Sequence, residues 1–144
     1  MRELVTEIEI EASSARVWRV LSDLDAYPEW NRFIRSITGE LKVGSTLNVR
    51  IEPESGPAAQ MAPIVVAVEP ERRFAWKGKL GFGGLFDGMH EFIIEPISET
   101  RVRFVQREEF TGILVPVIWP ILRKGTTQGF KEMNEALRKR AEGN

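Results

Sequence analysis

The feature that most constrains the fold is a repeated alternation of apolar and polar residues between residues 34 and 111. In one run Leu47, Val49 and Ile51 alternate with polar residues. In another, Phe74 and Trp76 alternate with Arg73, Ala75 and Lys77. Successive side chains of a strand point to opposite faces, so the pattern predicts an antiparallel sheet with one buried and one solvated face. Turn sequences such as KVGS, PESGP and PISET separate the runs. The strands predicted here are 34–41, 45–53, 60–69, 72–80, 86–97 and 101–111.

Segments of helical spacing flank these strands. A first strand is predicted over 2–11, and residues 12–24 then change to helical periodicity. Pro28 is suited to open a second short helix. The chain ends in a long amphipathic helix from Pro116 or Pro120 to Ala141, roughly 30–40 Å at 1.5 Å per residue. Its apolar stripe is Ile118, Leu122, Thr126, Phe130, Met133 and Leu137.

The element order is therefore β-α-α, six strands, then a long helix. A seven-stranded antiparallel sheet buries one face, and the terminal helix is the element that can cover it. At 144 residues the chain has the length of one domain. We predict an α+β fold in a single domain, 1–144.

Composition excludes several classes of function. The net charge is −1 and there are no cysteines, so no global field attracts nucleic acid, and disulfides and thiolate metal sites are impossible. The N-terminus lacks a signal-peptide pattern. The longest apolar run, 113–122, is about half of what a membrane-spanning helix needs. We expect a cytoplasmic protein with no nucleic-acid partner and no stable membrane insertion. The pattern assigns no oligomeric state.

Four segments together carry a family resemblance: ASSARVWRVLSDLDAYPEWNRFI, VAVEPERRFAWKG, HEFIIEP followed by TRVRFVQREEFTG, and the terminal helix. In their order and spacing the chain resembles the START-like (SRPBCC, helix-grip) superfamily, and within it the polyketide cyclase/dehydrase-type branch. The resemblance implies a curved sheet that grips the terminal helix around a deep apolar cavity. Members bind lipids, sterols, polyketides, plant hormones or aromatic compounds; some are cyclases, some are transfer proteins, and one branch assists the Hsp90 chaperone.

Three polar residues fall on the predicted inner face among aromatic ones. A hairpin that turns at residues 98–100 places Phe92 opposite Gln106 and His90 opposite Glu108, about 5 Å apart, so that imidazole and carboxylate could hydrogen-bond. A slip of two residues would pair His90 with Gln106 instead. Buried polar groups need partners, water or a ligand. The three residues either line a pocket or form a structural His–Glu pair.

Glycines leave two further alternatives open. Gly125 and Gly129 lie one turn apart near the buried stripe of the terminal helix. They either leave space for a cavity or allow close packing of helix and sheet. The loop GKLGFGGLFDG is either a flap over an opening or an ordinary mobile hairpin tip.

Three functional hypotheses remain. His90 is the only histidine, and no GxSxG elbow or HExxH helix is present, so we expect no metal and no cofactor. The leading hypothesis is binding or transport of a small apolar ligand in an internal cavity, without catalysis. The second is a cyclase/dehydratase-type enzyme with His90 and Glu108 as acid/base.

The third hypothesis is interaction with a protein, as in the Hsp90-activator branch, or contact with a membrane surface through ILVPVIWPILRK. Those apolar residues are more simply the cavity end of the terminal helix. The predicted ligand-binding residues are Trp30, Phe33, Val49, Val66, Phe74, Trp76, Phe86, His90, Phe92, Phe104, Gln106, Glu108, Phe110, Ile118, Leu122 and Thr126.

Overall fold

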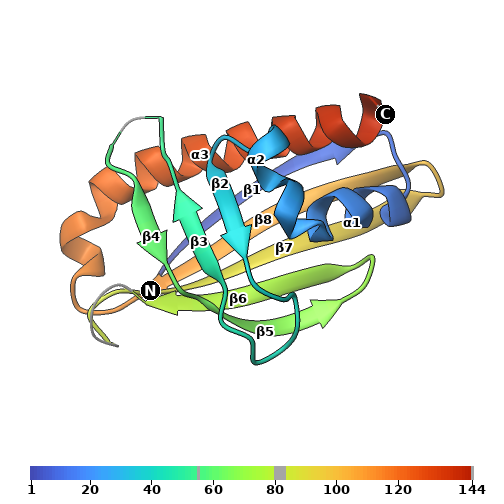
Figure 1. Ribbon diagram of the computed structural model, residues 1–144. Helices are drawn as coiled ribbons and strands as arrows, with labels where there is room; N and C mark the ends of the chain where they lie inside the picture. Colours follow the sequence, from blue (N-terminus) through green and yellow to red (C-terminus); the bar gives the residue numbers. More distant parts are fainter. Residues whose placement is uncertain (55, 80–83, 144) are drawn as a thin grey trace.

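The computed structural model describes residues 1–54, 56–79 and 84–143. In Figure 1 the long helix α3 crosses the inner face of a curved antiparallel sheet, and the short helices lie beside the C-terminal half of α3. The described elements are β1 (Arg2–Ile10), α1 (Ser14–Ser22), η1 (Leu24–Ala26), α2 (Tyr27–Trp30), β2 (Ile34–Thr38), β3 (Asn48–Ile51), β4 (Ala59–Met61), β5 (Ile64–Glu69), β6 (Arg73–Lys79), β7 (Asp87–Ser98), β8 (Arg101–Thr111) and α3 (Val115–Gly143). The α+β architecture of the prediction is confirmed.

The prediction of a single seven-stranded sheet is wrong in one respect. The described strands form a five-stranded sheet, β1-β8-β7-β6-β5, and a three-stranded sheet, β2-β3-β4. The predicted strand 60–69 is divided at Pro63, which has no N–H to donate to a neighbouring strand. Before the break β4 pairs with β3, and after it β5 pairs with β6. A bridge between Thr46 and Ile64 links the two sheets.

The same region corrects the prediction for Val66. A bulge interrupts the pairing of β5 between Val65 and Ala67. Val65 is the buried residue, at 1% exposure, whereas Val66 is 39% exposed. Val66 therefore points away from the interior, because the alternation that we counted along 60–69 does not continue through Pro63 and the bulge.

The hairpin of β7 and β8 has the register that the alternation predicted. His90 pairs with Glu108 and Phe92 with Gln106, and a bulge near the turn shifts only the last pairs. The outer face carries ion pairs, including Arg73 with Glu91 at 2.8 Å and the Arg107–Glu3 pair at 2.7 Å. Such exposed pairs contribute little to stability, but they place acidic groups among the basic ones on this face.

The corner after α1 distributes its three aromatic residues to three places. Tyr27 is fully buried, and its hydroxyl donates to the carbonyl oxygen of Leu21 at 2.7 Å. The buried side chain of Asn31 accepts hydrogen bonds from the N–H groups of Phe33 and the next residue, at 3.0 and 2.8 Å. This turn ends α2 and directs Phe33 inward, while Trp30 stays half-buried at the surface.

Candidate functional site

A cavity of about 290 Å³ lies between the first half of α3, the ends of β6, β7 and β8, and the β3–β4 hairpin. Eight of the sixteen predicted residues line it: Phe33, Trp76, Phe86, His90, Glu108, Phe110, Leu122 and Thr126. The lining that sequence reasoning missed is Ile51, Pro53, Gly56, Pro57, Ala59, Met61, Gly78, Lys79, Gly88, Ile121, Gly125 and Phe130. Apart from His90, Glu108, Thr126 and Lys79, the side chains around the space are apolar.

The other eight predicted residues lie outside the cavity wall. Val49, Phe74, Phe92, Phe104 and Gln106 are fully buried in the packed interior. Ile118 is half-buried on α3 and does not line the cavity, Val66 is exposed, and Trp30 lies on a surface groove. Alternation identifies the inner face of a strand; it does not distinguish the part of that face that contacts side chains from the part that faces empty space.

Paired glycines explain why the cavity lies at this end of the sheet. Gly78 and Gly88 are direct partners on β6 and β7, so two neighbouring inward positions have no side chain. A Cβ at Gly88 would lie 2.5 Å from Oε2 of Glu108, closer than real Cβ contacts. Glycine at 88 therefore provides the room that the Glu108 carboxyl group occupies.

The two glycines of α3 differ, although they lie one turn apart. A Cβ at Gly129 would overlap the ring of Phe33, so Gly129 permits close packing. Gly125 lines the cavity. Gly125 therefore leaves space for the cavity, whereas Gly129 allows close packing. The GKLGFGGLFDG loop alternatives concern residues 80–83, which lie outside the described residues.

A chain of hydrogen bonds runs from the cavity wall to β1. Nε2 of His90 lies 2.9 Å from Oε1 of Gln106. The Gln106 amide nitrogen donates to Oδ1 of Asn134 at 2.8 Å and to the carbonyl oxygen of Phe130 at 3.2 Å. Asn134 in turn donates to Oγ1 of Thr6 at 3.0 Å. Buried polar groups are thereby satisfied across β8, α3 and β1.

This chain determines which nitrogen of His90 carries the proton. The amide nitrogen of Gln106 is occupied by two acceptors, so its oxygen faces the imidazole and can only accept. Nε2 is then the donor, and in the neutral ring Nδ1 has a free lone pair. Nδ1 faces Oε1 of Glu108 at 3.6 Å, which is too long for the direct hydrogen bond that the predicted register allowed. The strand register is as predicted, but the hydrogen-bond partner of His90 is Gln106.

Burial makes both titratable groups neutral near pH 7. Burial lowers the pKa of His90 to about 3, because hydrogen bonding to Gln106 only partly offsets desolvation. The ring stacks on Phe92 with centroids 4.0 Å apart, and Phe130 lies 4.7 Å away. Burial also raises the pKa of the Glu108 carboxyl group to about 8. The site therefore presents a protonated carboxylic acid and an unprotonated imidazole nitrogen side by side.

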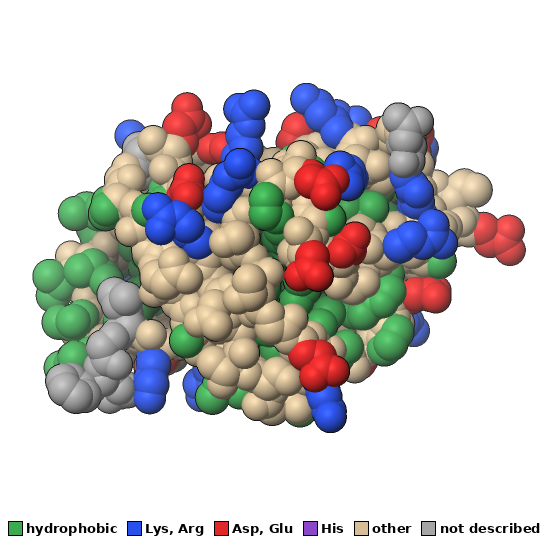
Figure 2. All heavy atoms as spheres, viewed as in Figure 1, with side chains coloured by type: hydrophobic (Ala, Val, Ile, Leu, Met, Phe, Trp, Pro, Cys, Tyr) green, Lys and Arg blue, Asp and Glu red, His purple; other side chains and the backbone are tan. Residues whose placement is uncertain are grey.

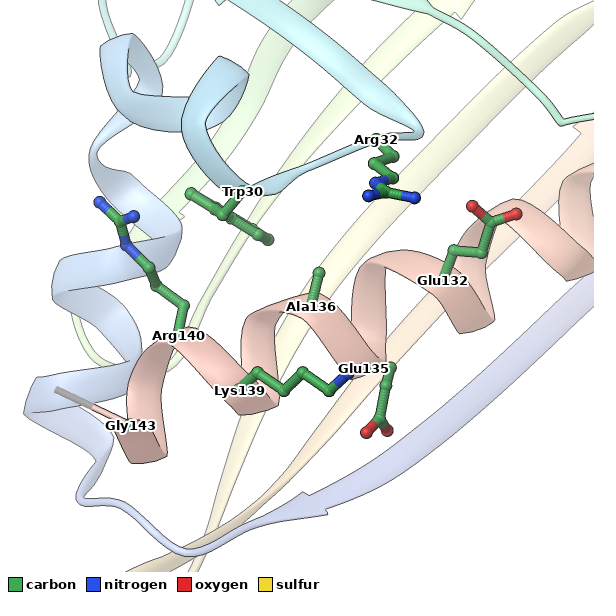
Figure 3. A pocket seen from close by; sticks show the side chains of 8 residues that line it. All are labelled: Trp30, Arg32, Glu132, Glu135, Ala136, Lys139, Arg140 and Gly143. Carbon is green, nitrogen blue, oxygen red and sulfur yellow. The ribbon is translucent and has the colours of Figure 1, made fainter.

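An open groove, distinct from the cavity, lies between α2 and the second half of α3 (Figure 3). Trp30 lines this groove beside Ala136 and Arg140. The prediction that Trp30 lines the cavity is therefore wrong. Its position after the Pro28 turn places it on the outer side of the corner, whereas Phe33, three residues later, is inside.

Asn134 and Thr6 belong to the site region but were not singled out from the sequence. Thr6 is buried on β1, at 8% exposure. Asn134 follows Met133 on the buried side of α3 and is 2% exposed. An asparagine within an apolar helical stripe is the signal that could have identified it, because such a residue needs a buried partner. Within the described residues no group of three or more His, Asp or Glu side chains could hold a metal ion.

The family model described as "Polyketide cyclase / dehydrase and lipid transport" matches residues 1–142. The chain belongs to this family. No curated protein matches in sequence. The helix-grip architecture is shared with many solved structures.

Three of these structures illustrate the range. A START superfamily protein from Mycobacterium smegmatis has a TM-score of 0.78 at 20% identity, covering 98% of this chain and 97% of that one. The Zhui aromatase/cyclase from a Streptomyces species has a TM-score of 0.79 at 15% identity, with coverages of 98% and 93%. Norcoclaurine synthase from Thalictrum flavum, in complex with dopamine and hydroxybenzaldehyde, has a TM-score of 0.71 at 19% identity, with coverages of 96% and 84%. At these identities the likeness concerns the fold.

Proposed function

We propose that this protein binds a small, uncharged, largely apolar molecule in the cavity, with a hydrogen-bonding group of that molecule directed at Glu108 and His90. The observation that carries the proposal is the combination of an apolar enclosed space with two polar side chains at one wall. The carboxyl group of Glu108 is the donor in this arrangement. A carbonyl or hydroxyl oxygen is the complementary group of the ligand.

The volume supports a compound of about two rings. A dry apolar cavity of roughly 150 Å³ accommodates benzene, and the space here is about 290 Å³. The aromatic residues Trp76, Phe86 and Phe110 supply flat apolar walls. A long acyl chain would have to extend through the mouth beside Ile121.

The electrostatics support an uncharged ligand. Lys79 is the only cationic side chain on the described cavity wall, and it is exposed at the mouth. An anionic group placed at Glu108 would therefore be buried without a counter-charge, which is strongly unfavourable. A cationic ligand would also lack a counter-charge, because Glu108 is protonated near pH 7.

The test uses two probes of the same ring system, 2-acetylnaphthalene and 2-naphthoate. We expect the neutral ketone to bind at least about tenfold more tightly than the carboxylate at pH 7, measured by calorimetry or by changes in ligand fluorescence. Thr126→Trp fills the cavity and should abolish binding of the ketone. Thr127→Trp, one residue along α3 and outside the cavity wall, is the matched control and should bind normally. Equal affinity for the two probes, or equal loss in the two variants, would contradict the proposal.

A second candidate function follows from the protonated Glu108. A neutral carboxylic acid near pH 7 can serve as a general acid toward a carbonyl group of a bound substrate. In that case Glu108 donates the proton, and His90, whose pKa is about 3, accepts hydrogen bonds. Glu108→Gln separates the two functions: as a binder the variant retains its ligand, and as an enzyme it retains the ligand and loses turnover.

A further inference from the structure

An exposed apolar row lies where α3 begins. Ile113, Val117 and Ile121 are 73%, 76% and 83% exposed, and Leu114 between them is 43% exposed. Val117 and Ile121 lie one turn apart on α3, and Ile113 lies in the turn just before the helix, so the exposed side chains form one ridge at its start. Figure 2 shows hydrophobic side chains gathered at the end of the molecule where α3 starts. We expected the apolar residues of ILVPVIWPILRK to form the cavity end of the terminal helix. Within that run, only Ile121 and Leu122 line the cavity.

The ridge continues into basic residues on the same side of the helix. After Val117 and Ile121, the positions at helical spacing are Lys124 and Lys131, both exposed, with Arg123 exposed beside them. No Asp or Glu occurs from Phe110 to Lys131. The second half of α3 differs, because its basic residues are mixed with acidic ones, as in the ion pairs of Arg138 with Glu135 and Glu142. The basic side chains of the first half, Arg123, Lys124 and Lys131, form no ion pair within the described residues, although Glu132 and Glu135 border the same groove and Gln128 donates to Glu54 at 2.7 Å. Only this half combines exposed aliphatic side chains with unpaired basic ones.

The ridge is continuous with the mouth of the cavity. Ile121 belongs both to the exposed row and to the cavity lining, and Lys79 is at the same mouth. A surface that covers the ridge would therefore also cover the opening, and an apolar molecule could pass between that surface and the cavity without crossing water.

We infer that Ile113, Val117 and Ile121, together with Arg123, Lys124 and Lys131, form a docking surface for the interface of an anionic lipid bilayer. The aliphatic side chains enter the boundary between headgroups and acyl chains, and the basic side chains contact anionic headgroups, as in other interfacial amphipathic helices. This is attachment to a surface. In the part of the chain that the structure describes, no helix is long and apolar enough to cross a membrane. The inference stands on surface residues and does not require the ligand proposed above.

The experiment is flotation of the full chain with empty vesicles. One set is phosphatidylcholine alone, and the other contains about 30% phosphatidylserine, a content that gives a negative surface potential. We expect binding to the anionic vesicles, weakened by salt, and little binding to the neutral ones. Ile113→Asp with Val117→Asp should abolish binding. Lys124→Gln with Lys131→Gln should weaken it about tenfold or more.

The matched control is Val43→Asp with Ile97→Asp, which places the same charges at exposed apolar positions elsewhere; it should float like the wild type. None of these residues lines the cavity, and thermal unfolding of each variant, followed by circular dichroism, reports whether the fold is intact. Absence of flotation by the wild type, or equal loss in the control variant, would overturn the inference. So would a wild-type dimer in light scattering that Val117→Asp converts to a monomer, because the ridge would then be covered by a second copy.

Discussion

The two ends of the inner sheet face are built from the same strands, yet one is filled and the other is hollow. At the filled end Phe74, Phe92 and Phe104 are fully buried, with stacked Phe74 and Phe92 rings 4.4 Å apart. Helices α1 and α3 cover them with Val17, Leu21, Met133 and Leu137. At the other end the equivalent inward positions include Gly78 and Gly88, and among the described residues α3, the β3–β4 hairpin and Phe33 lie across them.

The difference shows how this fold makes a cavity without weakening its sheet. Backbone pairing of β6, β7 and β8 continues through both ends. What changes is side-chain volume: replacing a large residue by glycine at an inward position leaves the ladder intact and removes the material that would fill the space. The packed core and the cavity therefore lie at different ends of one sheet.

The largest expected effect contrasts the two ends directly. Phe104→Ala removes a fully buried ring at the filled end and should reduce the free energy of unfolding by about 3–5 kcal/mol. Phe86 is half-buried at the hollow end, and its ring already borders empty space. Phe86→Ala should therefore reduce the free energy of unfolding by only about 1 kcal/mol. Urea denaturation of both variants measures the contrast. Equal losses would show that the two ends are packed alike.

An intermediate effect is expected for the two glycines of α3. Gly129→Ala introduces a methyl group that overlaps Phe33 and should destabilise the protein by about 1–3 kcal/mol. Gly125→Ala should have the opposite sign, with a gain of up to about 1 kcal/mol, because alanine favours the helix and the position borders the cavity. Thermal and urea unfolding of the pair provide the comparison. A loss at Gly125 as large as that at Gly129 would indicate a filled interior at both positions.

The smallest expected effect is a pH dependence at the hollow end. Glu108 keeps its proton up to about pH 8 in the folded chain, against 4.5 for the ordinary group, so its stabilising contribution is full at low pH and is lost as the pH rises toward 8. His90 acts in the opposite direction, but only below pH 6.5. The free energy of unfolding should therefore fall by about 1–2 kcal/mol between pH 6.5 and 8.

Glu108→Gln is the variant that isolates this effect. It removes the ionisable proton, so we expect its free energy of unfolding to change little between pH 6.5 and 8. Denaturant titrations of both proteins at several pH values give the two slopes. The same decline in the variant as in the wild type would assign the pH dependence to other groups.

Particular residues show where reasoning from the sequence succeeded. Period-two alternation placed His90 opposite Glu108, because a shift of one residue would have turned a whole apolar set toward water. It failed at Val66, because Pro63 and a bulge change the phase in a way that hydrophobicity does not reveal. It placed Trp30 and Phe33 together, although a turn held by Asn31 sends them to different surfaces.

The sequence by itself determined the order of the elements, the α+β class and the inner face of each long strand, because these depend on local periodicity and on which side chains avoid water. Only the tertiary structure decided where that inner face is empty, that His90 bonds Gln106 rather than Glu108, and that the start of α3 keeps three aliphatic residues in solvent. Such properties depend on distances between segments far apart in the chain. A pattern of residue types along one strand or helix does not contain those distances.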